Sequence, residues 1–421
     1  MVTRNALCSI GIAALVACWG RGAGAAGFAL SEQGTGTGNA YAGAAATAED
    51  ASTIFYNPAG LTQLPGRQVV LGVSGVKPSI DFSNGVSSPG IGKPLGTNNG
   101  DAGQWGAVPN FYLSWALTDR LWAGVGVNAP FGLKTSYDSN WIGRYQAIGS
   151  TLTSVNVNPT LAYKINDVVS VGAGASYQKL DATLTQAVNL GLAGEGSTRV
   201  NGDDWGWGWN VGALFDLAPD MRVGVAYRSK VSHRVEGDVQ FFAPPGVPLA
   251  GPIRNGPILA DITLPESASL SVFQKYNEFW DIMGDLTWTH WSRFQNLNIV
   301  RSDDLTLLQG TPQHWKNTYR FSLGLNYHVN ERWKLRGGFA YDQTPVPDQY
   351  RTARIPDEDR IWLAIGTQWK PIPALALDFG YAHLFVKNAS INDNQLPRNG
   401  LLNGSYSLSA DVLSLQLTYS F

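Results

Sequence analysis

The sequence predicts an all-β protein, a 14-stranded antiparallel transmembrane β-barrel with an N-terminal hatch (plug) inside the lumen. Two observations predict the wall. Apolar and polar residues alternate along segment after segment beyond residue 66, and the composition combines 44% hydrophobic residues with only 15% charged residues, 48 glycines and 15 tryptophans. A transmembrane barrel needs an apolar outer face, a polar inner face and aromatic girdles at both edges. A third observation predicts the plug, because the small-residue stretch from Gly27 to Leu61 lacks this alternation.

The last predicted strand shows the alternation most clearly. Its apolar face carries Leu413, Leu415, Leu417, Tyr419 and Phe421, and its polar face carries Ser414, Gln416, Thr418 and Ser420. In other strands the polar face also carries ionised groups, which a packed core could not hold without pairing them. The polar face is therefore expected to line a wet lumen, and the apolar face to contact lipid.

The number of strands follows from the connections between them, because outer-membrane barrels alternate tight periplasmic turns with long extracellular loops. Six tight turns are expected, at residues 118–120, 166–167, 218–220, 276–278, 329–331 and 370–373. Seven long connections are expected near residues 85–103, 129–152, 189–202, 242–259, 303–313, 344–357 and 389–403. These thirteen connections predict fourteen strands with both ends in the periplasm. Within residues 279–302 the sequence leaves open whether Trp291-Ser292-Arg293 is a bulge in one strand or a break between two.

The first 26 residues have the pattern of a cleaved secretory signal peptide, with an early cation, an uncharged stretch and small residues up to Ala26. Residues 27–65 are then expected to form the plug, and residues 66–421 the barrel. An alternative is lipidation at Cys18, which follows a lipoprotein-like Leu-Val-Ala sequence. Cleavage after Ala26 would remove both Cys8 and Cys18 and leave a mature chain without thiols.

The plug sequence carries several residues that together suggest a family. They are the Gly27-Phe28 start, a small-residue run with Tyr41 and Gly43, the acidic pair Glu49-Asp50, and Asn57-Pro58-Ala59. This arrangement resembles the N-terminal hatch of the FadL/OmpP1/TodX family of outer-membrane transporters for hydrophobic compounds.

The resemblance implies a passive channel in the bacterial outer membrane that takes up hydrophobic molecules, with long-chain fatty acids as the first expectation and aromatic hydrocarbons as the alternative. It implies no enzymatic activity and no cofactor. It also places Asn57, Pro58, Ala59 and Gly60 in the hatch near the ligand pocket. Taken by itself, Asn-Pro is a common turn starter. Because proline fixes its φ and lacks an amide donor, such a segment could move as a rigid kink.

The third predicted strand is short and contains Gly124 and Gly126, followed by Pro130 and Gly132. Glycine and proline mark bulges and broken pairing in a sheet. One interpretation is an ordinary strand end. The family resemblance implies instead a kink that opens the wall sideways, so that a hydrophobic solute leaves into the membrane rather than into water.

Four arginines are candidates for the polar end of a carboxylate-bearing substrate. They are Arg144 in the second long loop and Arg351, Arg354 and Arg360 in the sixth. A carboxylate needs a cation, and its tail needs an apolar slot. The alternative is that these cations pair with the acidic run from Asp357 to Asp359 and order an exposed loop.

Other chemistries find little support in the sequence. The five histidines lack metal-ligand spacing, no GxSxG motif occurs, and a net charge of −2 without a Lys/Arg run offers no footprint for nucleic acid. A hydrolase assembled from distant residues is not favoured by any motif. Trp205, Trp207 and Trp209 share the face of Val211 and so predict an outward aromatic girdle rather than a binding cage.

The expected partners are a hydrophobic ligand, outer-membrane lipid and lipopolysaccharide, and the barrel-assembly machinery, which would recognise the terminal Phe421. A monomer is expected. Two alternative functions stay open, a general aqueous porin and an adhesin or phage receptor. A porin would share the wall but would not need a plug of thirty-odd residues.

Overall fold

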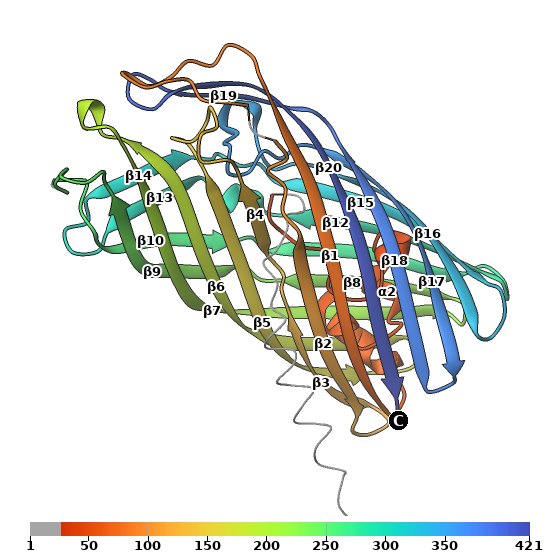
Figure 1. The fold of residues 1–421 in the computed structure, drawn as a ribbon. Helices are drawn as coiled ribbons and strands as arrows, with labels where there is room; N and C mark the ends of the chain where they lie inside the picture. Colours follow the sequence, from red (N-terminus) through yellow and green to blue (C-terminus); the bar gives the residue numbers. More distant parts are fainter. Residues whose placement is uncertain (1–26, 99, 250) are drawn as a thin grey trace, which may run out of the picture.

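A computed structural model describes residues 27–98, 100–249 and 251–421, so the predicted signal peptide and Cys18 lie outside the described residues. One antiparallel sheet closes on itself into a barrel (Figure 1). The closure is made by β1 (Arg67–Asn84), which pairs with β2 (Gly106–Ala116) on one side and with the last strand, β20 (Gly400–Ser420), on the other.

The wall has fourteen antiparallel strands, as predicted. The remaining uninterrupted wall strands are β5 (Gly149–Lys164), β6 (Val169–Asn189), β7 (Glu195–Ala218), β16 (Trp333–Asp342) and β17 (Arg360–Ile372). The others are each divided into two segments: β3 (Leu121–Asn128) and β4 (Gly132–Ser136), β8 (Met221–Arg228) and β9 (Val231–Phe242), β10 (Gly256–Leu264) and β11 (Ser267–Lys275), β12 (Trp280–Thr289) and β13 (Asn296–Arg301), β14 (Leu307–Pro312) and β15 (Thr318–His328), and β18 (Leu375–Val386) and β19 (Ala389–Gln395).

The ambiguous segment between residues 279 and 302 is one interrupted wall strand. The short 3-10 helix η4 (Trp291–Arg293) separates β12 from β13. Two further 3-10 helices, η3 (Gly191–Ala193) and η5 (Asp348–Tyr350), lie in the connections.

Exposure follows the predicted alternation. On β20, Leu415 is 46% exposed whereas Gln416 is 3% exposed. Trp205, Trp207 and Trp209 on β7 are all exposed, which agrees with the predicted outward position, and Tyr177 of the neighbouring β6 stacks on Trp205 with ring centroids 4.4 Å apart.

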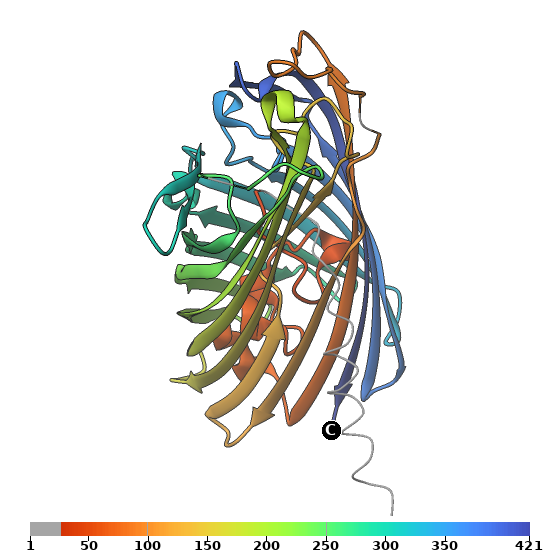
Figure 2. The same ribbon diagram turned by 60° about the vertical axis from the view of Figure 1, so that its left-hand side comes forward.

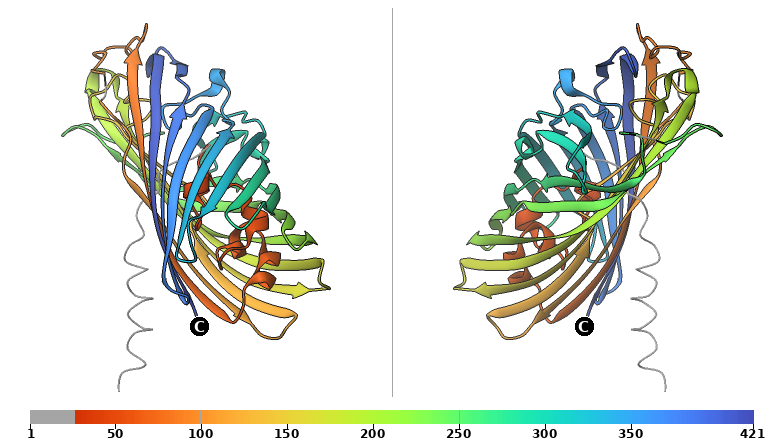
Figure 3. Two further views of the ribbon diagram at one scale, coloured as in Figure 1. Left: turned by 90° about the vertical axis from the view of Figure 1, so that its right-hand side faces the viewer. Right: turned by 90° about the vertical axis from the view of Figure 1, so that its left-hand side faces the viewer.

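The N-terminal residues 27–65, called the plug segment below, lie in the space that the wall encloses (Figures 2 and 3). Their elements are short helices of three to six residues: η1 (Thr37–Asn39), α2 (Ala44–Thr47), α3 (Thr53–Tyr56) and η2 (Pro58–Gln63). Alanines and glycines supply little side-chain volume, so the backbone of this segment packs directly on the inner wall. In the described ranges no helix is long and apolar enough to cross a membrane.

A set of inward-facing wall glycines provides the seat for the plug segment. A Cβ built on Gly338 would lie 2.1 Å from the carbonyl carbon of Asn39, and one on Gly224 would lie 1.8 Å from the carbonyl oxygen of Ala45. The members of this glycine seat are Gly172, Gly212, Gly224, Gly324, Gly338, Gly366 and Gly380. Any side chain at these positions would occupy volume that plug backbone or side chains fill now.

Candidate functional site

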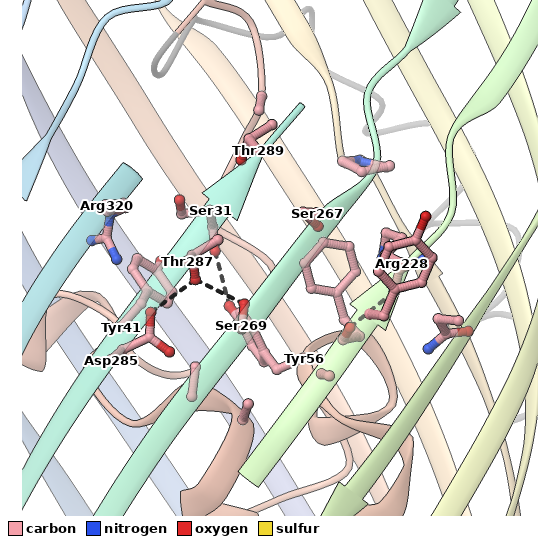
Figure 4. A pocket seen from close by; sticks show the side chains of 18 of the residues that line it. Ser31, Tyr41, Tyr56, Arg228, Ser267, Ser269, Asp285, Thr287, Thr289 and Arg320 are labelled. Carbon is pink, nitrogen blue, oxygen red and sulfur yellow. Dashed lines mark hydrogen bonds between the residues drawn. The ribbon is translucent and has the colours of Figure 1, made fainter. Parts of the chain in front are cut away.

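A cavity of about 150 Å³ lies between the plug segment and the wall (Figure 4). The plug side is mostly apolar, with Ala29, Leu30, Ala44, Ala45, Phe55 and Pro58 among its lining residues. The wall side is more polar and comes from β7, β8, β11, β12 and β15, together with Pro130 and Phe131. A lining that is apolar with a few convergent polar groups is characteristic of ligand sites.

Arg228, at the end of β8, points into this cavity. Its guanidinium donates to the backbone oxygen of Phe55 at 2.9 Å and lies 4.3 Å from the centroid of the Phe55 ring. Further contacts reach Ser176 and Asn158. Among residues 27–98, 100–249 and 251–421, no carboxylate forms an ion pair with Arg228, so its charge is available to an anionic ligand.

Arg320 is a second cation at the cavity, on β15. It donates to the backbone oxygen of Ala40 at 2.8 Å, and its guanidinium lies 5.1 Å from the ring centroid of Trp362. Arg320 is 9% exposed, and its position is therefore fixed both by the plug segment and by the wall.

A cluster of packed apolar side chains, called the apolar slot below, extends from the cavity to the outer end of the barrel. Phe131 and Ala29 line the cavity and also belong to a cluster of inward apolar side chains from β9, β10 and β13. The same cluster reaches a larger outer hollow of about 640 Å³, where Val239 and Ile299 belong to both. Apolar side chains are therefore continuous from the hollow to the cavity.

Phe28 closes this slot. It is 2% exposed and sits among four aromatic rings, with centroid distances of 4.8 Å to Trp291, 5.5 Å to Trp315, 5.9 Å to Phe294 and 6.0 Å to Phe131. The second described residue of the chain thus packs in the middle of the apolar cluster between the cavity and the outer hollow.

The wall is interrupted at the predicted kink between β3 and β4. β2 pairs with β3 only from Ala116 to Phe111, and β4 pairs with β5 on its other side. The first part of β2, before Phe111, therefore has no ladder of hydrogen bonds to β3 or β4. Pro130 and Phe131, which lie at the kink, line the cavity.

The plug segment satisfies the backbone groups that this kink leaves unpaired. Leu30 donates its amide to the oxygen of Pro130 at 2.9 Å, and Gly132 donates its amide to the oxygen of Phe28 at 2.9 Å. The side chain of Gln33 donates to the oxygen of Ala129 at 2.8 Å and accepts from the amide of Ala129 at 3.1 Å. Because buried backbone groups need partners, the plug closes the gap as an added strand would.

Gly124 and Gly126 of β3 make room for the plug segment. Ideal Cβ atoms at these positions would lie 2.6 Å and 3.2 Å from side-chain carbons of Ile54, which is fully buried. All four residues predicted for lateral opening thus contact the plug segment or a residue that it touches.

Asn57 links three elements around the segment predicted to move as a rigid kink. Its side chain donates to the backbone oxygens of Ala45 at 2.7 Å and Ala213 at 3.0 Å, and accepts from the amide of Ala59 at 3.0 Å. Pro58 and Ala59 rest on Gly172 of the glycine seat, and Gly60 has no room for a Cβ beside Thr53. The four residues therefore form the point at which α2, η2 and β7 are joined.

Ionic contacts tie the plug segment to the wall. Glu49 pairs with Lys334 and with Arg336, the latter at 2.8 Å, and Arg336 also pairs with Asp378. Glu32 is 1% exposed and has one carboxylate oxygen without a hydrogen-bond partner among the described residues. Burial raises the pKa of Glu32 to about 7.

The four arginines predicted as ligand residues are all buried and all have partners. Arg144 pairs with Glu195 at 3.1 Å, Arg351 with Asp348 at 2.8 Å, and Arg360 with Asp357. Arg354 donates to the oxygens of Gly149 and Ser150 at 3.1 Å. None of the four lines the cavity between plug and wall, although Arg351 borders the outer hollow. Their present contacts order the outer loops.

Arg228 was missed by the sequence analysis, although the sequence carries a signal for it. On β8 the inward positions are Arg222, Gly224, Ala226 and Arg228, so strand parity alone predicts two lumen cations there. Parity does not reveal that the plug backbone reaches one of them, because that contact joins residues 173 positions apart. Within the described residues, no group of three or more His, Cys, Asp or Glu is arranged to hold a metal ion.

Comparison with known proteins identifies the family. Residues 16–421 match the model of the outer membrane protein transport proteins, OMPP1/FadL/TodX. The chain belongs to this family. It is 31% identical to outer membrane protein P1 of Haemophilus influenzae, over 95% of this chain and 96% of the relative, and 29% identical to the long-chain fatty acid transport protein of Escherichia coli K12, over 87% and 90%.

Solved structures agree with this family assignment. The crystal structure of a Pseudomonas aeruginosa FadL homologue superposes with a TM-score of 0.86 at 27% identity and covers 94% of this chain and 100% of its own. The Ralstonia pickettii toluene transporter TbuX shares the fold, with a TM-score of 0.69 at 21% identity over 93% and 99%. The chain is thus an outer-membrane transporter of hydrophobic compounds, and the members of its family are channels rather than enzymes.

Proposed function

We propose that this channel takes up long-chain fatty acids, with the carboxylate bound at Arg228 and the tail in the apolar slot. The observation that carries the proposal is a partly buried guanidinium without an ionic partner among the described residues, at the inner end of an apolar path. Charge-assisted hydrogen bonds to a carboxylate are stronger than neutral ones, and Arg presents several donors at once.

Release is proposed to follow displacement of the plug segment. A tail entering the slot competes with Phe28 for the ring of aromatic side chains, and Phe28 is two residues from Leu30, which caps the kink. Loss of the contacts to Ala129, Pro130 and Gly132 would expose the gap between β2 and β4. A hydrophobic solute gains free energy by passing through that gap into lipid rather than into water.

The test is a comparison of oleic acid with oleyl alcohol, which shares the tail but lacks the charge. Binding to the purified protein in nanodiscs is measured for the wild type, for Arg228→Met, and for Arg234→Met, an exposed arginine paired with Asp261 on the outer surface. Loss of a hydrogen bond to a charged group costs about 1.5–3 kcal/mol. The preference for the acid should fall at least about tenfold in Arg228→Met and not in Arg234→Met; an unchanged preference would overturn the carboxylate site.

Aromatic hydrocarbons are the second candidate substrate class. The cavity of about 150 Å³ is lined in part by the rings of Tyr41, Phe55, Tyr56, Phe131 and Tyr227. An apolar cavity of roughly this volume accommodates a single benzene ring. Toluene binding that exceeds oleic acid binding, and that does not respond to Arg228→Met, would favour this class.

A general aqueous porin is distinguished by conductance in a planar bilayer. The plug segment fills the lumen against the glycine seat, so the intact protein should conduct small ions poorly and a protein lacking residues 27–60 should conduct well. Equal conductance of the two proteins would favour a porin.

A further inference from the structure

The wall of the cavity carries a ladder of hydroxyl groups that a purely hydrocarbon tail does not need. β11 contributes Ser267, Ser269 and Ser271, and β12 contributes Thr289, Thr287 and Asp285, as directly opposite pairs in the register of the two strands; Figure 4 labels all of them except Ser271. All of them except Ser271 line the cavity. We call this set the hydroxyl ladder.

Hydrogen bonds within the hydroxyl ladder run in one direction. Thr287 donates to Asp285 at 2.8 Å, so the contact of 2.8 Å between Thr287 and Ser269 is made with Ser269 as the donor. Ser271 also donates to Asp285 and accepts from the amide of Ala45 in the plug segment. This series of hydrogen bonds therefore begins at Ser269, whose oxygen can still accept a further hydrogen bond.

The next pair along the strands, Ser267 and Thr289, has hydroxyl groups without a hydrogen-bond partner among the described residues. When an apolar molecule fills a cavity, the polar groups of the wall lose their hydrogen bonds to water. This loss costs free energy unless the molecule offers hydrogen bonds in their place. A site built for a saturated chain alone would carry apolar side chains at these four positions, as the plug side of the same cavity does.

We propose that the cavity selects amphipathic chains with a second oxygen function, a hydroxyl group along the tail, in addition to the terminal carboxylate. This inference rests on the proposed binding of a carboxylate at Arg228. A ligand hydroxyl donates to the oxygen of Ser269, whose own proton is donated to Thr287. The ligand class is therefore an oxygenated fatty acid.

Strand register gives the spacing between the two polar contacts. Arg228 is opposite Ser267 on β11, and Ser267 is opposite Thr289 on β12, so these three residues form one row across the wall. Ser269 and Thr287 lie two residues further along their strands. With strands about 4.8 Å apart and a rise of about 3.4 Å per residue, the carboxylate and the second oxygen lie about 7–12 Å apart.

The experiment measures binding of stearic acid and of monohydroxystearic acids whose hydroxyl lies near the carboxylate, at mid-chain or near the methyl end. The proteins, in nanodiscs, are the wild type, the double variant Ser269→Ala with Thr287→Val, and Thr287→Ser, which keeps the hydroxyl. Ser170→Ala is the matched control, because Ser170 is a buried wall hydroxyl on β6 that does not line the cavity.

The wild type, Thr287→Ser and Ser170→Ala should bind one intermediate isomer about three- to tenfold more tightly than stearic acid, as expected for one or two added hydrogen bonds. In the double variant this ratio should fall to about one. The proposal is overturned if no isomer binds the wild type more tightly than stearic acid, or if the preference survives in the double variant. A preference that is lost in the double variant while Arg228→Met leaves acid binding unchanged would support the hydroxyl ladder and overturn only the carboxylate site.

Discussion

The backbone nitrogen of Gly27 donates to a carboxylate oxygen of Asp357 at 2.9 Å, in a buried contact between residues 330 positions apart. Asp357 also accepts from Thr344 at 2.7 Å and pairs with Arg360. The start of the described chain is thus held by the sixth long connection of the barrel, next to the aromatic rings that surround Phe28. The Asp357 carboxylate thereby connects an outer loop to the start of the plug segment, where Phe28 packs in the apolar slot.

Asp357→Ala should release this end of the plug segment. A hydrogen bond to a charged group contributes about 1.5–3 kcal/mol, so the opening of residues 27–33 should become more than tenfold more frequent. Hydrogen–deuterium exchange of that peptide measures the opening, and bilayer conductance should rise with it. Asp357→Asn keeps one acceptor and should fall between the wild type and the alanine variant. Equal exchange in all three proteins would show that this contact does not hold the plug.

Sequence alone predicted the wall well because each strand carries its own evidence. Leu415 and Gln416 differ in exposure because adjacent side chains of a strand point to opposite faces of the sheet, and the two residue types alone show which face is apolar. The strand count follows from local turns, and it was correct although many strands are interrupted, since Trp291-Ser292-Arg293 interrupts a strand without reversing it.

The candidate site was harder to predict because it is made by contacts between distant parts of the chain. Arg351 and Arg360 were selected as cations in a long loop, but their partners are close acidic residues that the same loop supplies. Arg228 lies at the cavity only because Phe55 of the plug is placed beside it. Asn57 and Pro130 were selected through the family resemblance, and no local pattern specifies their contacts with Ala213 and Leu30.

The glycine seat offers a test with an internal control. Gly338 faces the plug, where a Cβ would overlap Asn39, whereas the adjacent Gly337 has no atom within 4 Å of a built Cβ. Gly338→Ala should displace η1 and destabilise plug docking by about 1–3 kcal/mol, the usual cost of overpacking. Gly337→Ala should leave docking unchanged. Protease cleavage within residues 27–65 and bilayer conductance both report the result, and equal behaviour of the two variants would contradict the packing argument.

Plug docking should depend on pH through Glu32. Burial raises the pKa of this carboxyl to about 7 from an ordinary value of 4.5, although Arg320 and Arg360 act in the opposite direction and Asp342 adds to the increase. The protonated form is favoured in the docked state, so the contribution of Glu32 is complete below pH 4.5 and is lost as the pH rises through about 7. The protection factors of residues 27–33, which correct the exchange for its intrinsic pH dependence, should therefore fall over that interval. Glu32→Gln, which cannot ionise, should remove this dependence; a variant that keeps it would assign the titration to another group.

Gln33 provides the most direct test of how the lateral gap is closed. Its fully buried side chain makes two hydrogen bonds to the backbone of Ala129, where the wall strand is interrupted. Gln33→Met keeps the volume of the side chain but leaves the amide and carbonyl of Ala129 without these partners, at a cost of about 1–3 kcal/mol for each group left unsatisfied. Amide exchange at Ala129 should accelerate, and an apolar fluorescent probe should reach the membrane of proteoliposomes faster. Gln63→Met is the control, because Gln63 also belongs to the plug segment but bonds to Asp216. If both variants release the probe at the wild-type rate, closure of the kink by the plug segment does not limit passage.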